Sequence, residues 1–270
     1  MTVDAQLFSE FPIFAGRLAD AARIETLPRF RTGAAVANKA GLKFDPVTDA
    51  DREAERVVRR MISAVYPAHG VIGEEFGAER ADAEYRWVID PIDGTRAFVC
   101  GVSTWATLIG LEHSGKPALG LIDQPFTDER WIGVPGKAVY RRGGGERECR
   151  TSGVTELARA RLSTTDPRRE AYFTGEEAAA FAFLAAKTQV ARFSLDAYAY
   201  GLLAIGELDL VVESSLAHHD YCALIPVVEG AGGVISGWKG EPLGDCARGR
   251  IIAAATPELH QAAVAQLNKY

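Results

Sequence analysis

The sequence predicts a mixed α/β protein, of the layered α+β kind, built in two halves. Helical spacing of apolar residues near the N-terminus gives way to short apolar runs between turn residues, and after that helices alternate with strands. The first pattern is typical of helices on an antiparallel sheet, and the second of a mixed or parallel sheet covered by helices. With 270 residues, of which 47% are hydrophobic, the chain can bury a substantial core.

The N-terminal half, residues 1–150, is predicted to begin with two helices. Apolar residues recur at helical spacing over 4–30, where Pro12 fits only near a break or a first turn. A second helix is expected to begin near Thr48, because Thr48 and Asp51 form a capping pattern.

Short apolar runs bounded by turn residues predict the strands of this half. Two early runs lead directly into acidic residues, and the four later runs predict an antiparallel meander. The predicted strands are 71–73, 87–89, 104–111, 118–122, 130–134 and 138–141.

In the C-terminal half, residues 151–270, helices are predicted to alternate with strands. The predicted helices are 176–187, 196–206, 219–231 and 257–268, and the predicted strands are 208–212, 233–235 and 250–255. The boundary is expected between Arg142 and Leu162, where 143–145 (GGG) is the most linker-like tripeptide.

Charge and cysteine usage exclude several classes of protein. A net charge of −6 and a pI of about 5.5 lack the basic footprint of a nucleic-acid-binding protein, so no nucleic-acid partner is expected. Residues 1–10 lack a basic stretch followed by an apolar core, and no apolar run approaches roughly 18 residues, so we expect a cytoplasmic protein without a membrane partner. The cysteines form no C-x-x-C pair, which argues against a zinc cluster and gives no support for disulfides. They are Cys100, Cys149, Cys222 and Cys246.

The hexapeptide DPIDGT at 90–95 is the most informative motif. A strand that delivers Asp90 and then turns through the proline can aim both aspartates at one point, where a hard cation such as Mg²⁺ finds oxygen ligands. The glycine lets the backbone pass close to a ligand, and the amides of Gly94 and Thr95 would open a helix that receives phosphate oxygens. For the hexapeptide alone a solvated turn stays an alternative, because Asp, Pro and Gly are common turn residues.

Three further acids are placed to complete such a site. Glu74 follows the predicted strand 71–73, so two strand ends can converge on one metal. Asp51 and Asp220 stand at predicted helix starts, where an acid also has an ordinary explanation because it complements the helix dipole. A pair of metal ions about 4 Å apart would need several carboxylates from different segments, as in enzymes that displace a phosphate ester in line.

Four motifs together resemble, in order and spacing, the inositol monophosphatase superfamily, over about residues 43–235. The motifs are 47–51 (VTDAD), 73–75 (GEE), 87–95 (WVIDPIDGT), and 219–220 (HD) ahead of 229–233 (EGAGG). The resemblance implies a five-layer α/β/α/β/α sandwich with an N-terminal antiparallel sheet and a C-terminal mixed or parallel sheet, usually assembled as a homodimer. It also implies a magnesium-dependent, lithium-sensitive phosphomonoesterase.

Within the superfamily, the chain is most similar to the bacterial histidinol-phosphate phosphatase branch. The similar segments are 96–98 (RAF), 105–109 (WATLI), 162–167 (LSTTDP) and 196–200 (DAYAY). The similarity implies hydrolysis of L-histidinol phosphate to L-histidinol and phosphate, and a role in histidine biosynthesis. In one departure, Ser194 and Leu195 stand where the branch usually has two glycines, and a side chain as large as Leu195 could narrow or reshape the alcohol pocket.

The resemblance also implies a ligand set for two magnesium ions. Glu74, Asp90 and the carbonyl oxygen of Ile92 would hold the first ion. Asp90, Asp93 and Asp220 would hold the second, so that Asp90 bridges the two. The first ion would lower the pKa of its bound water, and the second would stabilise the charge on the departing alkoxide.

The remaining matched residues would act on water, phosphate and alcohol. Thr95 with Asp51 would orient the attacking water, so these two residues and Glu74 are the predicted catalytic residues. The amides of Gly94 and Thr95 would bind phosphate oxygens. Asp196 and Glu213 match positions that contact the alcohol, and two acids there suit a cationic amine or imidazole, although Glu213 would also suit a polyol hydroxyl.

Some residues near these motifs have ordinary explanations that we keep open. Glu213 would also fit a solvated strand end. Arg96 and Arg192 are expected to form surface ion pairs in preference to substrate contacts. His218 and His219 adjoin a predicted ligand, but carboxylate-rich magnesium sites rarely use imidazole, so we keep both out of the ligand set.

Two other functions stay open. The first is an inositol-1-phosphate phosphatase or a related sugar-alcohol phosphatase, which belongs to the same reaction class. The second is a noncatalytic phosphate-binding or interaction module, which would be expected if a ligand or Thr95 had been lost. Every matched acid is present in this chain, which favours the enzyme.

Overall fold

The computed structural model describes residues 3–33, 37–38, 46–169, 171–244 and 249–269. Its α-helices are α1 (Val3–Thr26), α2 (Asp49–Val65), α3 (Thr95–Val99), α4 (Gly175–Ala185), α5 (Tyr198–Ala204), α6 (His218–Tyr221), α7 (Leu224–Gly230) and α8 (Pro257–Leu267). In these described ranges no helix combines the length and the apolar character needed to cross a membrane.

The strands form one small and two large sheets. Those of the first half are β1 (Ala37–Asn38), β2 (Pro46–Val47), β3 (Gly70–Gly73), β4 (Gly77–Glu79), β5 (Tyr85–Asp93), β6 (Ala106–His113), β7 (Lys116–Gln124), β8 (Glu129–Val134), β9 (Lys137–Arg142) and β10 (Gly145–Glu148). Those of the second half are β11 (Arg161–Thr164), β12 (Val190–Phe193), β13 (Leu210–Glu213), β14 (Val234–Gly237) and β15 (Ile251–Ala254).

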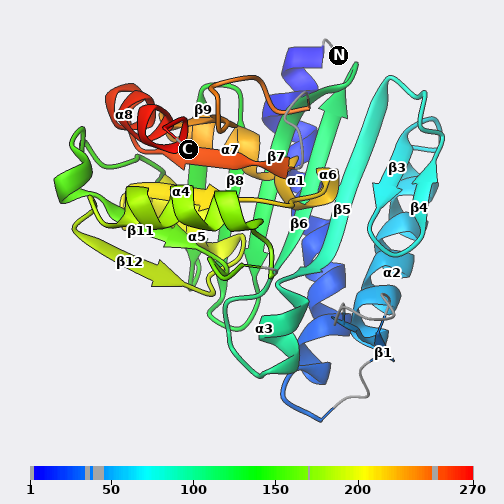
Figure 1. Cartoon of the computed structure of the whole chain (residues 1–270). Helices are drawn as coiled ribbons and strands as arrows, with labels where there is room; N and C mark the ends of the chain where they lie inside the picture. The colour runs from blue at the N-terminus through cyan, green and yellow to red at the C-terminus, as the bar shows by residue number, and fades with distance from the viewer. Residues whose placement is uncertain (1–2, 34–36, 39–45, 170, 245–248, 270) are drawn as a thin grey trace.

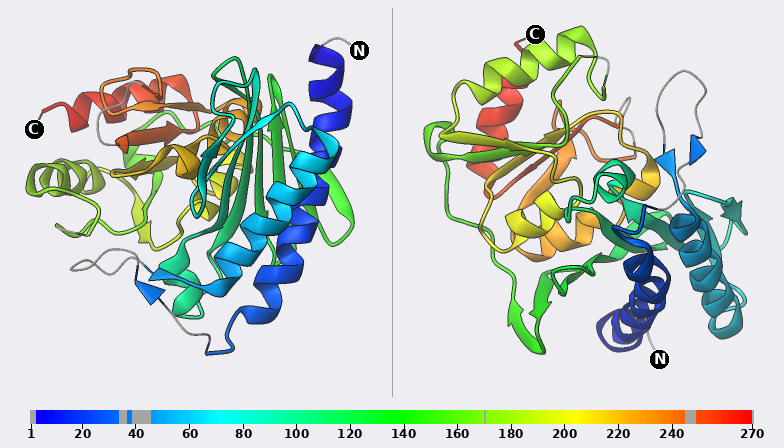
Figure 2. Two further views of the ribbon diagram at one scale, coloured as in Figure 1. Left: turned by 90° about the vertical axis from the view of Figure 1, so that its right-hand side faces the viewer. Right: turned by 90° about the horizontal axis from the view of Figure 1, so that it is seen from below.

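These elements stack in five layers (Figure 1). Helices α1 and α2 lie side by side on one face of the eight-stranded sheet, and α5 and α7 fill the space between that sheet and the five-stranded one. Helices α4 and α8 cover the outer face of the second sheet, as the view from below in Figure 2 shows. The predicted five-layer sandwich is therefore confirmed.

The two large sheets differ in strand direction. The eight-stranded sheet has the order β10-β9-β8-β7-β6-β5-β3-β4 and is antiparallel except where β3 pairs with β5. The five-stranded sheet has the order β12-β11-β13-β15-β14 and is mixed, because β11 runs parallel to β12 and β13 while β15 runs antiparallel to β13 and β14. The predicted meander and the predicted mixed sheet are both present.

Three local predictions are wrong. Helix α1 continues through Pro12 without a break. The missing N–H leaves the carbonyl of Phe8 without its helical partner, and Phe8 is exposed, so water can take that bond. The glycines at 143–145 belong to the β9–β10 hairpin and do not form a linker. The helix predicted over 219–231 is split into α6 and α7, since Pro226 has no N–H to offer the carbonyl of Cys222.

Three glycines let α7 lie close to the first sheet. Gly110, Gly120 and Gly133 occupy paired positions on β6, β7 and β8. A Cβ on Gly120 would stand 1.9 Å from the carbonyl oxygen of Ala223, and one on Gly133 would stand 2.2 Å from that of Pro226. Side chains here would push away the segment that carries Asp220, so these glycines help to place a predicted metal ligand.

The two halves share a core. Buried residues of the eight-stranded sheet, such as Trp131, pack with Tyr200 of α5 and Leu224 of α7 in one hydrophobic cluster. A division into separate domains at residue 150 stays a prediction.

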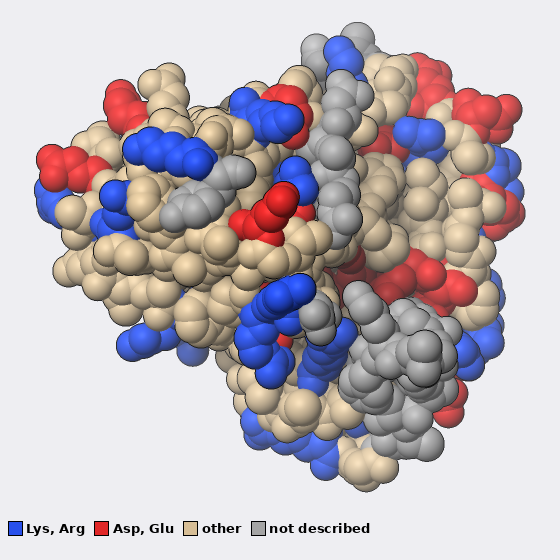
Figure 3. Space-filling model, viewed as in Figure 1, with Lys and Arg blue, Asp and Glu red and all other residues tan. Residues whose placement is uncertain are grey.

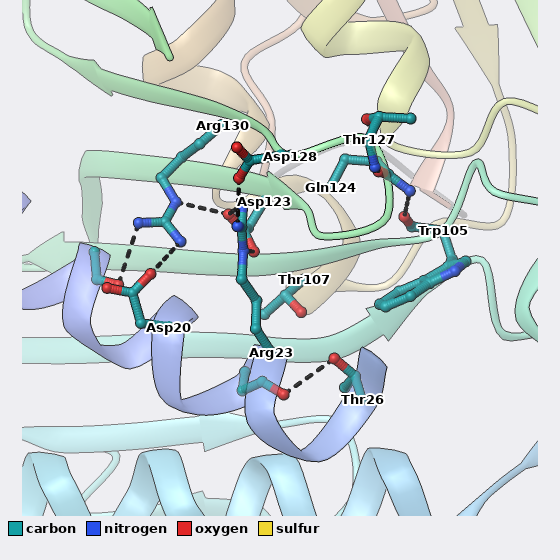
Figure 4. A network of polar contacts seen from close by, with 12 residues as sticks. Asp20, Arg23, Thr26, Trp105, Thr107, Asp123, Gln124, Thr127, Asp128 and Arg130 are labelled. Carbon is teal, nitrogen blue, oxygen red and sulfur yellow. Dashed lines mark hydrogen bonds and ion pairs between the residues drawn. The ribbon is translucent and has the colours of Figure 1, made fainter. Parts of the chain in front are cut away.

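A buried ion-pair network joins α1 to the first sheet (Figure 4). Asp123 at the end of β7 is fully buried, and both of its oxygens accept hydrogen bonds from Arg23 of α1, at 2.7 and 2.8 Å. Arg130 of β8 donates to Asp123 at 2.6 Å and to Asp20 of α1 at 2.7 Å. Two arginines thus offset the cost of burying this carboxylate.

Candidate active site

A cavity of about 440 Å³ lies where the two halves meet. Figure 3 shows Asp and Glu side chains gathered beside the hollow at the centre of this face, with Lys and Arg side chains on the neighbouring rim. All but one of the predicted site residues line the cavity: Glu74, Asp90, Ile92, Asp93, Gly94, Thr95, Asp196, Glu213 and Asp220. The exception is Asp51.

Three aspartates in the cavity form a cluster of oxygen donors. Carboxylate oxygens of Asp90, Asp93 and Asp220 lie within 4.8 Å of one another. Burial, and then repulsion from Glu74, Asp93 and Asp220, raises the pKa of Asp90 well above its ordinary value. Burial and repulsion from Asp196 and Asp220 do the same to the pKa of Asp93. A divalent cation would relieve this repulsion, and a set of oxygen donors fits Mg²⁺.

An irregular strand end places the first two aspartates. The prediction that the strand ends at Asp90 and turns through the proline is wrong, because β5 runs on to Asp93 with its register shifted between Asp90 and Asp93. The amide of Ile92 donates to Asp90 Oδ1 at 3.0 Å. The hydroxyl of Thr107 donates a hydrogen bond to the carbonyl oxygen of Pro91 at 2.8 Å. The irregular strand end therefore leaves this carbonyl with a hydrogen-bond partner.

Gly94 is required at the turn from β5 into α3. Its φ of +78° is in the left-handed region that favours glycine, and a Cβ there would stand 2.9 Å from the carboxylate carbon of Asp196. Helix α3 begins at Thr95, whose hydroxyl donates to the carbonyl of Ile92 at 3.1 Å. The first amides of a helix lack helical partners, so they remain open to an anion in the cavity.

The second half supplies Asp220 and a backbone amide that donates a hydrogen bond to Asp93. Asp220 caps α6, where its Oδ2 accepts from the amide of Ala217 at 2.6 Å. Asp93 Oδ2 accepts from the amide of Ala197, just before α5, at 2.7 Å. Each acid therefore has a backbone contact that fixes one of its oxygens.

Glu55, which the sequence reasoning missed, holds the turn that carries Glu74. Glu55 is fully buried in α2, and its carboxylate accepts from the amide of Glu75 at 2.8 Å and that of Phe76 at 3.2 Å. Arg59 donates to the same carboxylate at 2.7 Å. The signal was present, because Glu55 follows Asp51 by one helical turn and so faces the same side of α2.

Replacing Glu55 by glutamine is expected to weaken metal binding by about 10–100-fold, the usual cost of losing an outer partner of a ligand. The glutamine side chain would lack the negative charge that pairs with Arg59, and it would hold the turn at Glu74 less firmly. Calorimetric titration with Mg²⁺ measures the effect, and Glu53→Gln, at a half-exposed position of α2, is the matched control. An unchanged metal affinity in Glu55→Gln would refute the anchoring role.

Asp51 stands behind the cavity wall. Its Oδ2 accepts from the amide and the hydroxyl of Thr48, which confirms the predicted cap, while its buried Oδ1 has no hydrogen-bond partner among the described residues. Burial, together with the charges of Glu75 and Glu74, raises the pKa of Asp51 to about 6. Its contribution to orienting water stays a prediction.

A second acidic pair in the cavity consists of Asp196, which is half-buried, and Glu213. Glu213 is buried, so its interpretation as a solvated strand end is wrong. Glu213 accepts from the amide and hydroxyl of Thr165, at 2.7 and 2.9 Å, and from the hydroxyl of Thr164 at 3.1 Å. Burial raises the pKa of Glu213 to about 8 and that of Asp196 to about 6.

Leu195 does not narrow the cavity. It packs against the hydrophobic core between the sheets and is absent from the cavity wall, so the expectation that it reshapes the alcohol pocket is wrong. The departure from glycine affects the backbone instead. Ser194 has a φ of +64° and Asp196 one of +48°, both left-handed, which explains why glycine suits this turn.

Replacing Ser194 by glycine is expected to stabilise the protein by about 0.5–1 kcal/mol, because the left-handed conformation costs a non-glycine residue about 1–2 kcal/mol. Ser194 is exposed, and its side chain makes no hydrogen bond in the described structure. Urea unfolding measures the change. Ser63→Gly, at an exposed position inside α2, is the control and should lower stability by about 0.5 kcal/mol. A loss of stability in Ser194→Gly would contradict the inference that the backbone at Ser194 is strained.

Arg96 and Tyr172 add to the cavity wall. Arg96 stacks over the ring of Tyr172 at 4.7 Å, and its expected role in a surface ion pair stays a prediction. Arg192 is exposed and donates to the carbonyl of Ala191, but within the described part of the chain it does not form the expected ion pair. His219 lines the cavity, whereas His218 does not. Tyr172 lies in no recognisable motif, so no signal in the sequence would have found it.

Without metal, the protein is expected to lose stability as the pH rises from about 4 to about 8. Asp51, Asp196 and Glu213 have folded-state pKa values of about 6, 6 and 8, above the ordinary values. The folded state then binds more protons than the unfolded state in this window, so each group lowers stability by up to about 1.4 kcal/mol per pH unit until it ionises. Urea unfolding in a chelator tests this, and saturating Mg²⁺ should flatten the slope. Stability rising with pH in the chelator would contradict the assignment.

The layered α/β fold places a carboxylate-lined cavity between its two halves. The sequence profile of the inositol monophosphatase family matches residues 10–270. The chain belongs to this family, and it is therefore a phosphatase, a hydrolase of phosphoric monoesters.

Relatives of the chain carry more than one substrate in their names. The bifunctional phosphatase IMPL2, chloroplastic, of Arabidopsis thaliana is 38% identical over 266 residues, which cover 95% of this chain and 75% of that protein. A histidinol-phosphatase of Mycobacterium tuberculosis is 35% identical over 237 residues, 83% of this chain and 86% of that protein. A solved inositol monophosphatase from Zymomonas mobilis has a TM-score of 0.84 at 38% identity, covering 97% of this chain and 98% of that one. The choice of alcohol therefore depends on this chain's own residues.

Proposed function

We propose that the protein is a magnesium-dependent phosphatase that hydrolyses L-histidinol phosphate, which would place it in histidine biosynthesis. The observation that carries the proposal is a pair of acids in the cavity, the buried Glu213 and the half-buried Asp196. Loss of surrounding water raises the pKa of both carboxyl groups. A cationic amine or imidazole of the substrate would compensate their charge, whereas a neutral polyol would leave the cost of burying that charge in place.

The acids that line the cavity would hold the metal ions. Bound Mg²⁺ supplies positive charge that neutralises phosphate oxygens and acidifies water. Asp90, Asp93 and Asp220 have their carboxylate oxygens close enough to share such a cation, and Glu74 lies beside Asp90, with which it forms a hydrogen bond. The carbonyl of Ile92, now an acceptor for Thr95, completes the proposed set.

The attacking water would be held at the start of α3. The hydroxyl of Thr95 lines the cavity and can accept a hydrogen bond from water while it donates to the carbonyl of Ile92. Asp51 Oδ1, which is buried and has no hydrogen-bond partner in the described part of the chain, is the proposed acceptor for a proton relayed from this water. The amides of Gly94 and Thr95 would bind phosphate oxygens as charge builds on them.

Turnover of two substrates side by side tests the proposal. Initial rates with L-histidinol phosphate and with inositol 1-phosphate are measured at saturating Mg²⁺ and again in a chelator. We expect a higher kcat/KM for histidinol phosphate and loss of both activities in the chelator. A preference for inositol 1-phosphate would overturn the substrate assignment, and full activity in the chelator would overturn the metal dependence.

An inositol-1-phosphate or related sugar-alcohol phosphatase is the second candidate. It is favoured by the similarity to the solved inositol monophosphatase and by Glu213, whose carboxylate can also accept from a hydroxyl. A noncatalytic module has less support, because every predicted acid except Asp51 lines the cavity. Homodimeric assembly, a cytoplasmic location and the absence of a nucleic-acid partner stay predictions.

A further inference from the structure

A second group of metal-ligating side chains lies outside the acidic cavity. A carboxylate oxygen of Glu112 on β6, an imidazole nitrogen of His218 and the sulfur of Cys222 lie within 4.8 Å of one another. None of the three lines the cavity that holds Asp90, and they differ from the aspartates there in offering oxygen, nitrogen and sulfur together. This group is called the mixed-donor cluster below.

The fold brings the three side chains of the mixed-donor cluster together from two elements. His218 and Cys222 are four residues apart at the two ends of α6, where the amide of Cys222 bonds the carbonyl of His218 at 3.1 Å, so their side chains share one face. Figure 1 shows α6 beside β5 and β6, and Glu112 on β6 reaches His218 Nε2 at 2.9 Å. The sequence offered only this i, i+4 spacing, which a search for C-x-x-C pairs does not detect.

Cys222 is a buried cysteine whose thiol has no bonding partner among the described residues. The residue is fully buried, and among the described residues its sulfur makes no disulfide and no hydrogen bond. Burial raises the pKa of this thiol well above its ordinary value, so without metal the group is a neutral thiol. Its sulfur nevertheless lies within 4.8 Å of a carboxylate oxygen of Glu112 and a ring nitrogen of His218.

Arg86 leaves one oxygen of Glu112 for a metal. The guanidinium of Arg86 pairs with Glu112 Oε2 at 2.7 Å, while Oε1 faces His218. A carboxylate that binds a cation through one oxygen and a fixed partner through the other is a common arrangement around protein metal sites. Glu112 and a Cys222 thiolate together carry the two negative charges that neutralise a divalent ion.

We propose that Glu112, His218 and Cys222 form a binding site for Zn²⁺, separate from the acidic magnesium site. Thiolate, imidazole and carboxylate are the ligands that Zn²⁺ takes in proteins, and three of them leave a fourth position for water. The side chain of His218 is 35% exposed, which gives the ion a way in. Binding forms the Zn–S bond and releases the thiol proton of Cys222 to solvent. The ion would fasten α6 to β6.

Titration of the tag-free full-length protein with Co²⁺, a coloured substitute for Zn²⁺, tests the site at saturating Mg²⁺. We expect one equivalent of Co²⁺ to produce a thiolate-to-cobalt charge-transfer band, and Zn²⁺ to remove it by competition. Asp93→Asn, which disables the acidic site, should keep the band. Zn²⁺ should also raise Tm in the wild type.

Variants of the mixed-donor cluster decide the outcome. Cys222→Ser should lose the band, and His218→Gln should weaken metal affinity by at least about 100-fold, since even outer partners of ligands are worth about 10–100-fold. His218 is partly exposed, so its variant should fold even if the Cys222 variant does not. Cys100→Ser, which removes an exposed thiol, is the control and should behave as wild type. A band that survives in Cys222→Ser, or no band in the wild type, would overturn the proposal.

Discussion

Asp93→Asn is expected to abolish magnesium-dependent phosphate release while the protein stays folded. Asparagine keeps an oxygen that can accept from the amide of Ala197, the contact that now holds the Asp93 side chain. It removes one of three negative charges whose oxygens lie within 4.8 Å of one another. Because the metal contributes several kcal/mol of charge stabilisation in the transition state, the rate should fall by about 10³-fold or more.

A second prediction for Asp93→Asn concerns stability, which should not fall when activity is lost. Repulsion from Asp196 and Asp220, added to burial, raises the pKa of Asp93, so a neutral side chain should be at least as stable as the acid in the absence of metal. Steady-state rates and urea unfolding in a chelator measure the two effects together. Asp82→Asn, at an exposed turn, is the matched control for both. Activity retained in Asp93→Asn would remove the two-metal account, and a large loss of stability would show that the acid is mainly structural.

The acidic cluster of the candidate metal site could be predicted from the sequence because its signals are local. Asp90 and Asp93 stand three residues apart at the end of an apolar run, and Thr48 with Asp51 forms a cap that is visible within four residues. Strand ends and helix starts are also the places where backbone geometry directs side chains to a shared edge. The periodicity of the chain predicted helices and strands for the same reason, whereas the five layers were an implication of the family resemblance.

The rest of the cavity depends on contacts that no local pattern carries. Glu213 receives its hydrogen bonds from Thr164 and Thr165, 49 and 48 residues away in the chain. Outside the cavity, the contact of Glu112 with His218 likewise spans 106 residues. Strand β11, which carries Thr164, is four residues long and was missed, because so short a run has no clear period.

Glu213→Gln is expected to discriminate between the two candidate substrates. Loss of a buried charge that pairs with a cationic group costs about 2–5 kcal/mol, so kcat/KM for histidinol phosphate should fall by about 30–5,000-fold. A polyol hydroxyl can bond glutamine almost as well, so kcat/KM for inositol 1-phosphate should change by less than about tenfold. Glu207→Gln, at an exposed position, is the control and should leave both values unchanged.

Asp196→Asn extends this argument to the pair of acids. Asparagine tolerates the left-handed backbone of residue 196, so the turn should keep its shape. If both acids contact the same cationic group, the free-energy loss of the double variant, calculated from kcat/KM, should be smaller than the sum of the losses of the two single variants. The reason is that the first substitution already weakens the binding of the cationic group, so the second removes a weaker interaction. Losses that add in full would indicate that Asp196 and Glu213 contact separate parts of the substrate. Equal losses for the cationic and the neutral substrate would mean that the pair shapes the cavity without selecting charge.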